Sequence, residues 1–146
     1  KNLLRRDGIR LPKDVRDRLE NGLLITAADH MEFQEFRRQF NKESLELMET
    51  IDVIIGPTEP ITAFTPETTE IKLDSQAIDP RVAVSTYTRI FNLNGFPAIT
   101  LPCGFSRNKH PIGLQLAGKP YEDATILQVA HAYEEANDWN NRRPLL

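Results

Sequence analysis

Few residues in this sequence have the types and spacing that nucleophilic chemistry needs. Its four serines are isolated from one another, and no Gly/Ser-rich run is present: Ser44, Ser75, Ser85 and Ser106. The one cysteine, Cys103, follows an apolar segment, and His110 is the nearest histidine along the chain. A cysteine nucleophile needs a base and a lowered thiol pKa, whereas a cysteine ending an apolar strand usually packs as a small hydrophobic residue. A small cysteine hydrolase using Cys103 is therefore one alternative.

The histidines and carboxylates lack the spacing of metal ligands. The three histidines lie far apart and outside any His-Glu-x-x-His arrangement: His30, His110 and His131. Asp29, Glu32 and Glu35 recur every three residues, which on a helix is typical of a solvated acidic face. The seven glycines are scattered and form no phosphate-binding loop. We therefore expect no metal and no cofactor.

Composition indicates a single globular domain in a reducing compartment. The 146 residues are 40% hydrophobic and 27% charged, which allows a core and a polar surface. Mean hydropathy is -0.43, and with no long apolar segment and no signal-peptide pattern we expect no membrane contact. The net charge of -3 argues against a nucleic-acid surface. A single cysteine excludes an internal disulfide, so a cytoplasmic location is expected.

Two helices are predicted before residue 50. Apolar residues three to four positions apart over residues 11–19 mark a short amphipathic helix, with Gly22 at the C′ position just after it. The segment TAAD at residues 26–29 resembles a capping box and predicts a long helix from about residue 27 to residue 49. Apolar residues follow one face of that helix, and we expect them in the core, with Phe36 and Phe40 against a sheet. They are Phe33, Phe36, Phe40, Leu47 and Ile51.

The middle of the chain predicts a strand and then a long connection. The apolar run at residues 51–56 reads as a buried strand of a parallel or mixed sheet, closed by Pro57. Residues 57–80 are a long Pro- and Thr-rich loop. A loop of this length in a compact domain usually has a function, so it is either a lid or tunnel wall, or partly disordered.

Residues 80–135 predict a helix, two strands and a last helix. Asp79 and Pro80 form a helix start, and Gly95 supplies a left-handed helix stop. The run at residues 98–101 and the alternating residues 112–116 predict two strands, paired antiparallel across a turn. A final helix begins near Asp123.

Five motifs resemble the C-terminal part of the amidase signature enzymes, which are amide hydrolases that include the A subunit of tRNA-dependent amidotransferases and fatty acid amide hydrolases. The motifs are DVIIGPT at residues 52–58, NLNGFPA at 92–98, LPCGF at 101–105, PIGLQL at 111–116 and AHAYE at 130–134. Each motif alone is weak, but their order and spacing are together specific. The segment ENGLLITAAD at residues 20–29 looks more like the general amidases than like the amidotransferase subunit.

This resemblance implies a serine acyl-enzyme mechanism whose residues the chain lacks. The family uses a Ser-Ser-Lys triad, with its serines in a Gly/Ser-rich stretch upstream of these motifs, and no such stretch occurs here. We therefore assign no catalytic residue and expect this chain alone to be inactive. The resemblance places Pro57 and Thr58 near the substrate end of their strand, and Asn92, Gly95 and Pro97 near the acyl pocket.

The pattern and the resemblance together indicate an α/β fold, a mixed sheet with packed helices that is part of the larger amidase signature fold. Residues 1–146 would be the C-terminal part of an amidase domain, supplying sheet core and part of the pocket for a small-molecule amide. The expected partner is a second copy or the N-terminal portion of the parent protein. The other alternative is a self-sufficient binding or interaction domain without catalysis.

Overall fold

The computed structural model describes residues 10–139, 141 and 142. The chain forms two compact units, divided between Phe40 and Asn41. Helix α3 (Ala27–Met48) contributes residues to both units.

Helix α2 of the first unit spans Lys13–Gly22. Gly22 is its last residue, and the helix ends on Leu23 in the right-handed conformation. The N–H groups of Leu23 and Leu24 bond to carbonyls of the last turn at 2.9 and 3.1 Å. The expected C′ position of Gly22 is therefore wrong, because Gly22 lies inside the last turn, which closes its hydrogen bonds through Leu23 and Leu24.

Helix α3 begins with the predicted capping box. The Asp29 carboxylate accepts hydrogen bonds from the backbone N–H and the hydroxyl of Thr26, both at 2.8 Å. In return, the Thr26 hydroxyl accepts the N–H of Asp29 at 3.1 Å. These contacts satisfy N–H groups that a helix start otherwise leaves unpaired, and they confirm the predicted helix start.

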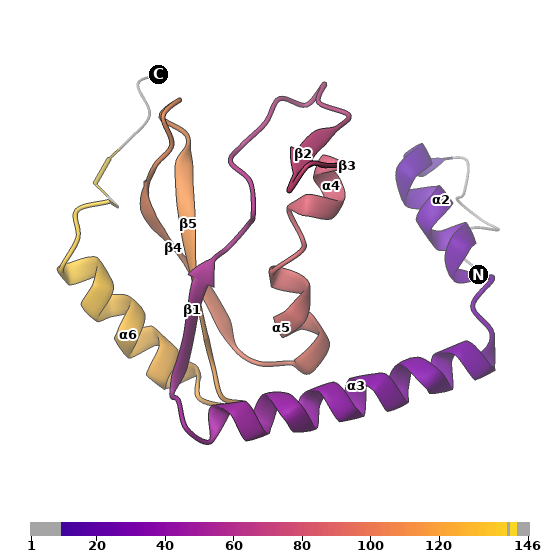
Figure 1. Ribbon diagram of the computed structural model, residues 1–146, viewed down its shortest axis with the longest axis horizontal. Coiled ribbons are helices and arrows are strands. Elements are labelled where there is room, and N and C mark those ends of the chain that lie inside the picture. Colours follow the sequence, from indigo (N-terminus) through magenta and orange to yellow (C-terminus); the bar gives the residue numbers. More distant parts are fainter. Residues whose placement is uncertain (1–9, 140, 143–146) are drawn as a thin grey trace. The chain divides into compact units, whose positions relative to one another are not determined.

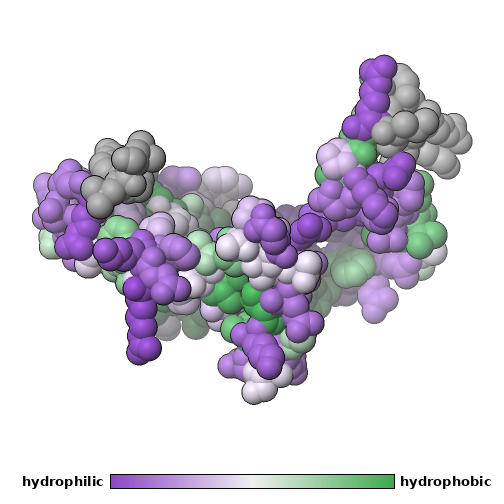
Figure 2. Space-filling model, turned by 90° about the horizontal axis from the view of Figure 1, so that it is seen from above, coloured by the Kyte–Doolittle hydropathy of each residue, from purple (hydrophilic) through white to green (hydrophobic). Residues whose placement is uncertain are grey.

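The phenylalanine stripe of α3 is not buried as expected. Phe33 and Phe36 are 64% and 59% exposed, and Phe40 is half-buried. The Phe36 ring stacks on the ring of Phe40, with centroids 6.2 Å apart. Figure 2 shows hydrophobic surface among the hydrophilic residues of the chain. The expectation failed because helical spacing predicts which residues share a face, whereas burial needs a second surface to cover that face.

The second unit is built on a three-stranded sheet. Its strands are β1 (Val53–Pro57), β4 (Ala98–Phe105) and β5 (Pro111–Gly118), in the order β1-β5-β4 (Figure 1). The α/β class with helices packed on a sheet is confirmed, as is the antiparallel pairing of β4 with β5. Strand β1 also pairs antiparallel with β5, which corrects the expected parallel or mixed pairing of β1. It lies at the sheet edge, and Ile55 is 62% exposed, so β1 is only partly buried.

One face of this sheet carries the core. Helix α6 (Asp123–Glu135) lies along that face, and Ala130 packs with Leu101 of β4 and Leu116 of β5 (Figure 1). Partly buried hydrophobic residues surround this cluster: Val53, Ile99, Leu114, Val129 and Tyr133. Burial of these side chains fixes the register of the strands, because a shift by one residue would move them to the other face.

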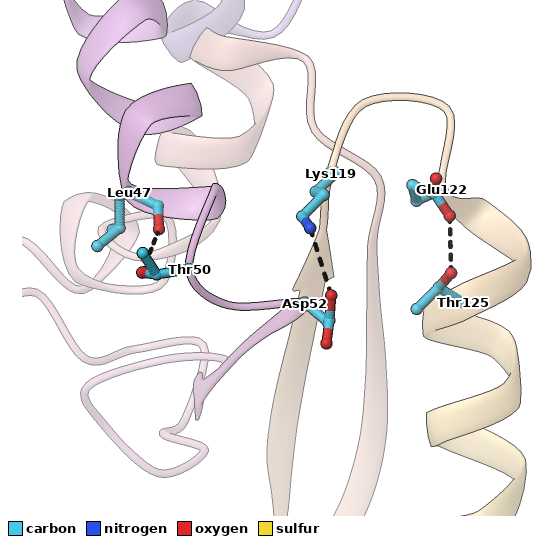
Figure 3. A network of polar contacts seen from close by, with 6 residues as sticks. All are labelled: Leu47, Thr50, Asp52, Lys119, Glu122 and Thr125. Atoms are coloured by element: carbon cyan, nitrogen blue, oxygen red, sulfur yellow. Dashed lines mark hydrogen bonds and ion pairs between the residues drawn. The ribbon is translucent and has the colours of Figure 1, made fainter.

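Polar contacts hold the ends of the strands. Asp52, just before β1, pairs with Lys119, just after β5, at 3.3 Å (Figure 3). Figure 3 also shows the Thr125 hydroxyl donating to the Glu122 carboxylate at 2.8 Å, at the start of α6. Since Asp52 is 87% exposed, this pair contributes little free energy.

The connection over residues 57–80 contains more structure than the predicted loop. Strands β2 (Ile71–Leu73) and β3 (Gln76–Ile78) form an antiparallel hairpin. Asp74 and Ser75 at its tip have positive φ angles of 47° and 69°. The segment is thus a long connection with a hairpin at its end, closed by the next helix.

The helix predicted from Pro80 to Asn94 is divided into two. Helix α4 (Pro80–Ala83) begins as predicted, because the Asp79 side chain accepts the N–H of Arg81 at 2.8 Å. A turn follows, and α5 (Thr88–Asn94) then leads to Gly95, whose φ of 74° confirms the predicted left-handed stop. The stop directs the chain into β4.

Candidate functional site

Three adjoining hollows lie on the second unit, beside α5 and the sheet. The turn hollow, of about 550 Å³, lies at the α5–β4 turn. The sheet hollow, of about 340 Å³, lies between α5 and residues of β4 and β5. The loop hollow, of about 210 Å³, lies between the segment after β1 and the same strands. Asn92 lines both the turn and sheet hollows, and Thr100 lines both the sheet and loop hollows, so the three form a series.

Four of the five predicted substrate-binding residues line these hollows. Asn92, Gly95 and Pro97 lie together in the turn hollow, and Asn92 also reaches the sheet hollow. Thr58 lines the loop hollow. Pro57 is the last residue of β1 and is absent from the lining of the three hollows. Whether any of these residues binds substrate stays a prediction.

The turn between α5 and β4 is held by its own hydrogen bonds. The buried Asn94 side chain accepts the N–H of Phe96 at 3.0 Å, and the N–H of Gly95 donates to the Phe91 carbonyl at 2.9 Å. The Pro97 carbonyl accepts the N–H of Gly118 at 3.0 Å. A glycine suits the centre of this turn, because its positive φ strains other residues. The backbone at the turn hollow is therefore fixed in shape.

Thr100 and Gln115 also line the site, and sequence reasoning missed both. The Thr58 hydroxyl donates to the Thr100 hydroxyl at 3.2 Å, joining the segment after β1 to β4. Gln115 faces Thr100 across the ladder and is 7% exposed. The available signal was alternation: both occupy positions between apolar residues that face the core, and such positions share the opposite face.

The chain's own nucleophiles are not set up for catalysis. Cys103 is half-buried beside the irregular pairing of β4 with β5, and within the described residues it has no hydrogen bond to His110. The His110 ring nitrogen Nδ1 is buried without a partner in this part of the chain. The hydroxyl of Ser85 donates to helix carbonyls, and that of Ser106 accepts the N–H of His110. Within the described residues, the cysteine alternative therefore has no base hydrogen-bonded to its thiol.

Other functional classes receive no support from the described part of the chain. Its His, Cys, Asp and Glu side chains form no group of three or more that could hold a metal ion. Among the same residues, no helix has the length and apolar character needed to cross a membrane. The hollows beside α5 are the candidate site because Thr58, Asn92, Gly95 and Pro97 line them.

Comparison with known proteins decides the family. The family model described as Amidase matches residues 12–127. This chain belongs to the amidase family. Among curated relatives of this family, the A subunit of glutamyl-tRNA(Gln) amidotransferase from Thiobacillus denitrificans is 40% identical over 119 residues, covering 80% of this chain. Its counterpart from Thermodesulfovibrio yellowstonii is 39% identical over 115 residues, covering 77% of this chain.

Solved amidase-family structures share the fold. The structure described as amidase has a TM-score of 0.86 at 27% identity, and the match covers 92% of this chain and 31% of that one. The 6-aminohexanoate cyclic dimer hydrolase has a TM-score of 0.72 at 25% identity, covering 92% of this chain and 30% of that one. The family and fold implied by the five motifs are thus confirmed. The chain spans 22–23% of the length of the two curated relatives named above.

Proposed function

We propose that this amidase-family chain forms part of an enzyme that hydrolyses amide C–N bonds of a small molecule. It supplies sheet core and the pocket wall made by the turn, sheet and loop hollows. The observation that carries this proposal is the position of Thr58, Asn92, Gly95 and Pro97, chosen from the sequence, along one series of hollows.

In this proposal, the chain's own residues bind and orient the substrate, and the acyl-enzyme forms on a serine outside this sequence. The fixed backbone around Gly95 lets a ligand approach closely where no side chain intervenes. Asn92 offers both a donor and an acceptor to the turn and sheet hollows. Orienting the amide before attack is a large part of such catalysis, because it removes the entropy cost of bringing the reactants together.

The partner we propose for this chain is the N-terminal portion of the whole protein. Exposed apolar side chains of the first unit line a hollow of about 580 Å³, with two carboxylates at its side. Its lining residues are Leu24, Ile25, Asp29, Glu32, Phe33 and Phe36. Exposed apolar patches of this kind mark contact surfaces. Relatives several times longer than this chain have residues that could cover it.

The test is an amide-hydrolysis assay on the whole protein and on this chain. We expect turnover of aliphatic or aryl amides by the whole protein and none by the chain alone. In the whole protein, Thr58→Val and Asn92→Ala should lower kcat/KM about tenfold or more. Thr69→Val, at an exposed position of the same connection, is the matched control and should leave it unchanged. Turnover by the chain alone that vanishes in Cys103→Ala would instead support the cysteine hydrolase.

A second candidate follows from the curated relatives at 39–40% identity, which are A subunits of glutamyl-tRNA(Gln) amidotransferase. On this candidate, the whole protein takes part in amidating glutamyl-tRNA(Gln). Amidation of that tRNA in the assay, without hydrolysis of simple amides, would favour it over a general amidase. Inactivity of the whole protein in both assays would favour a binding domain without catalysis.

A further inference from the structure

The sheet hollow contains a buried polar side chain that the fold does not use. Gln115 lies on β5, the central strand, with Gly56 of β1 and Thr100 of β4 as its register partners. Its neighbours Leu114 and Leu116 belong to the core beneath α6. Because successive side chains of a strand point to opposite faces, Gln115 lies on the face away from α6, where it lines the sheet hollow.

Two polar side chains of the described chain are more than nine-tenths buried, and they differ in their partners. Asn94 is 8% exposed, and its side chain accepts the N–H of Phe96. Gln115 is 7% exposed, and its carboxamide has no hydrogen bond within residues 10–139, 141 and 142. A carboxamide carries two donor hydrogens and one acceptor oxygen. The buried side-chain atoms without a partner in this part of the chain are Asn41 Oδ1 and His110 Nδ1, so the polar atoms of Gln115 keep access to the sheet hollow that the residue lines. The Gln115 carboxamide is therefore available to a ligand.

The walls of the sheet hollow select against charge. All seven lining side chains are uncharged, among them Thr88, Asn92 and Thr100, whereas the turn hollow includes Asp123 and the loop hollow includes Glu59. A carboxylate or ammonium group in the sheet hollow would lose its hydration without gaining an opposite charge. The volume of about 340 Å³ falls within the range of small-molecule sites.

We propose that Gln115 is a specificity-determining residue that hydrogen-bonds an uncharged carboxamide group of the ligand in the sheet hollow. A carboxamide both donates and accepts, so it can pair with Gln115 through two hydrogen bonds, which neither a carboxylate nor an ammonium group can do. This inference rests on the proposed function, because it takes the sheet hollow as part of the substrate pocket. Beyond the proposed function, the inference names Gln115 as the residue that recognises the polar group of the ligand, and it states that this group is uncharged.

The experiment is an NMR titration of the isotope-labelled chain with benzamide, benzoate and benzylamine. Benzamide should shift the side-chain NH₂ resonances of Gln115 and bind about tenfold more tightly than either charged probe. Gln115→Leu should weaken benzamide binding about tenfold and abolish the preference. Gln128→Leu makes the same chemical change at an exposed position of α6 and should bind like the wild type. Equal benzamide affinity in Gln115→Leu and wild type would overturn the proposal.

Folding and occupancy are tested separately. Gln115→Leu should unfold at about the same denaturant concentration as wild type, because no side-chain hydrogen bond of the described residues is lost. If the variant fails to fold, an intermolecular NOE between benzamide and the wild-type Gln115 NH₂ decides the matter, and its absence overturns the proposal. Loss of the benzamide shift when the whole protein is used would mean that polypeptide fills the hollow, which also overturns it. The titration measures binding and does not depend on hydrolysis. If the whole protein hydrolyses amides but benzamide does not contact Gln115, only the role of Gln115 is refuted, and the proposed function stands.

Discussion

Thr58 donates a hydrogen bond to Thr100 at 3.2 Å, and both side chains lie directly over Gly113 of the central strand. A Cβ atom at residue 113 would lie 2.7 Å from the Thr58 Oγ1 and 3.0 Å from the Thr100 Cγ2. The pair therefore occupies the space that a side chain on β5 would need. This close packing joins the proposed substrate-binding Thr58 to the sheet.

Gly113→Ala should destabilise the chain by about 1–3 kcal/mol, because the added methyl overpacks the site. Gly56→Ala is the matched control, since a Cβ there meets nothing within 4 Å. Denaturant titration measures both. Adding Thr58→Ala to Gly113→Ala should restore part of the loss by removing the nearest atom. An unchanged unfolding midpoint in Gly113→Ala would show that the threonines move aside freely.

Asp29 should make the stability of α3 depend on pH in the acid range. Hydrogen bonds from the backbone N–H of Thr26, and then from its hydroxyl, lower the pKa of Asp29. The folded pKa thus lies below the unfolded value of about 3.9. The carboxylate's contribution is fully present above that unfolded value and is lost as pH falls through the folded pKa.

NMR titration of the Asp29 carboxyl tests this directly. Thr26→Val should raise the pKa of Asp29 part of the way toward its ordinary value, because the hydroxyl is lost while the larger cause, the backbone N–H, remains. Asp29→Asn should weaken the acid-induced loss of helix, whereas Glu32→Gln on the same helix should not. A Thr26→Val variant with an unaltered Asp29 titration would contradict the capping box.

Phe36 and Met48, both on α3, should respond oppositely to truncation. Phe36 is 59% exposed, so Phe36→Ala should change the free energy of unfolding of this chain by less than about 1 kcal/mol. Met48 is 1% exposed, so Met48→Ala should cost about 2–5 kcal/mol. Denaturant titration compares the two, and a large loss in Phe36→Ala would mean that the stripe is covered in solution.

Gly95→Ala should cost about 1–2 kcal/mol, because φ at this position is 74° and a Cβ disfavours the left-handed region. No atom lies within 4 Å of the added Cβ, so the loss comes from the backbone alone. Gly95→Asn should cost less, since asparagine tolerates this conformation better. Equal losses in the two variants, measured by thermal unfolding, would point to another cause.

Features fixed by neighbouring residues were predictable from the sequence. The capping box of Thr26 and Asp29, the helix start at Asp79 and the stop at Gly95 each depend on a few adjacent positions, and the structure has all of them. The hairpin over residues 71–78 was missed. Its tip is Asp74-Ser75, which is not among the glycine-containing pairs that identify such turns in a sequence.

Features that depend on distant surfaces were not predictable. The stripe containing Phe33 and Phe36 has the spacing of a core face, but no pattern along a helix says what covers it. In the sequence, Gln115 is one of the polar positions of an alternating strand. Its burial follows from its place between β1 and β4, which is set by pairing across 65 residues of sequence, from Val53 to Gly118.

The strand order has a consequence for biosynthesis. The central strand, β5, leaves the ribosome after β1 and β4, and each of these pairs with β5 in the sheet. At about 5–20 residues per second, β1 waits roughly 3–12 s for its partner. During this time neither edge strand has its native neighbour, and apolar strands without partners are prone to pair with other chains. Nascent chains stalled before residue 111 should therefore lack the sheet and bind chaperones. Once β5 has emerged, β1 and β4 can both pair with it, and the chaperones should dissociate.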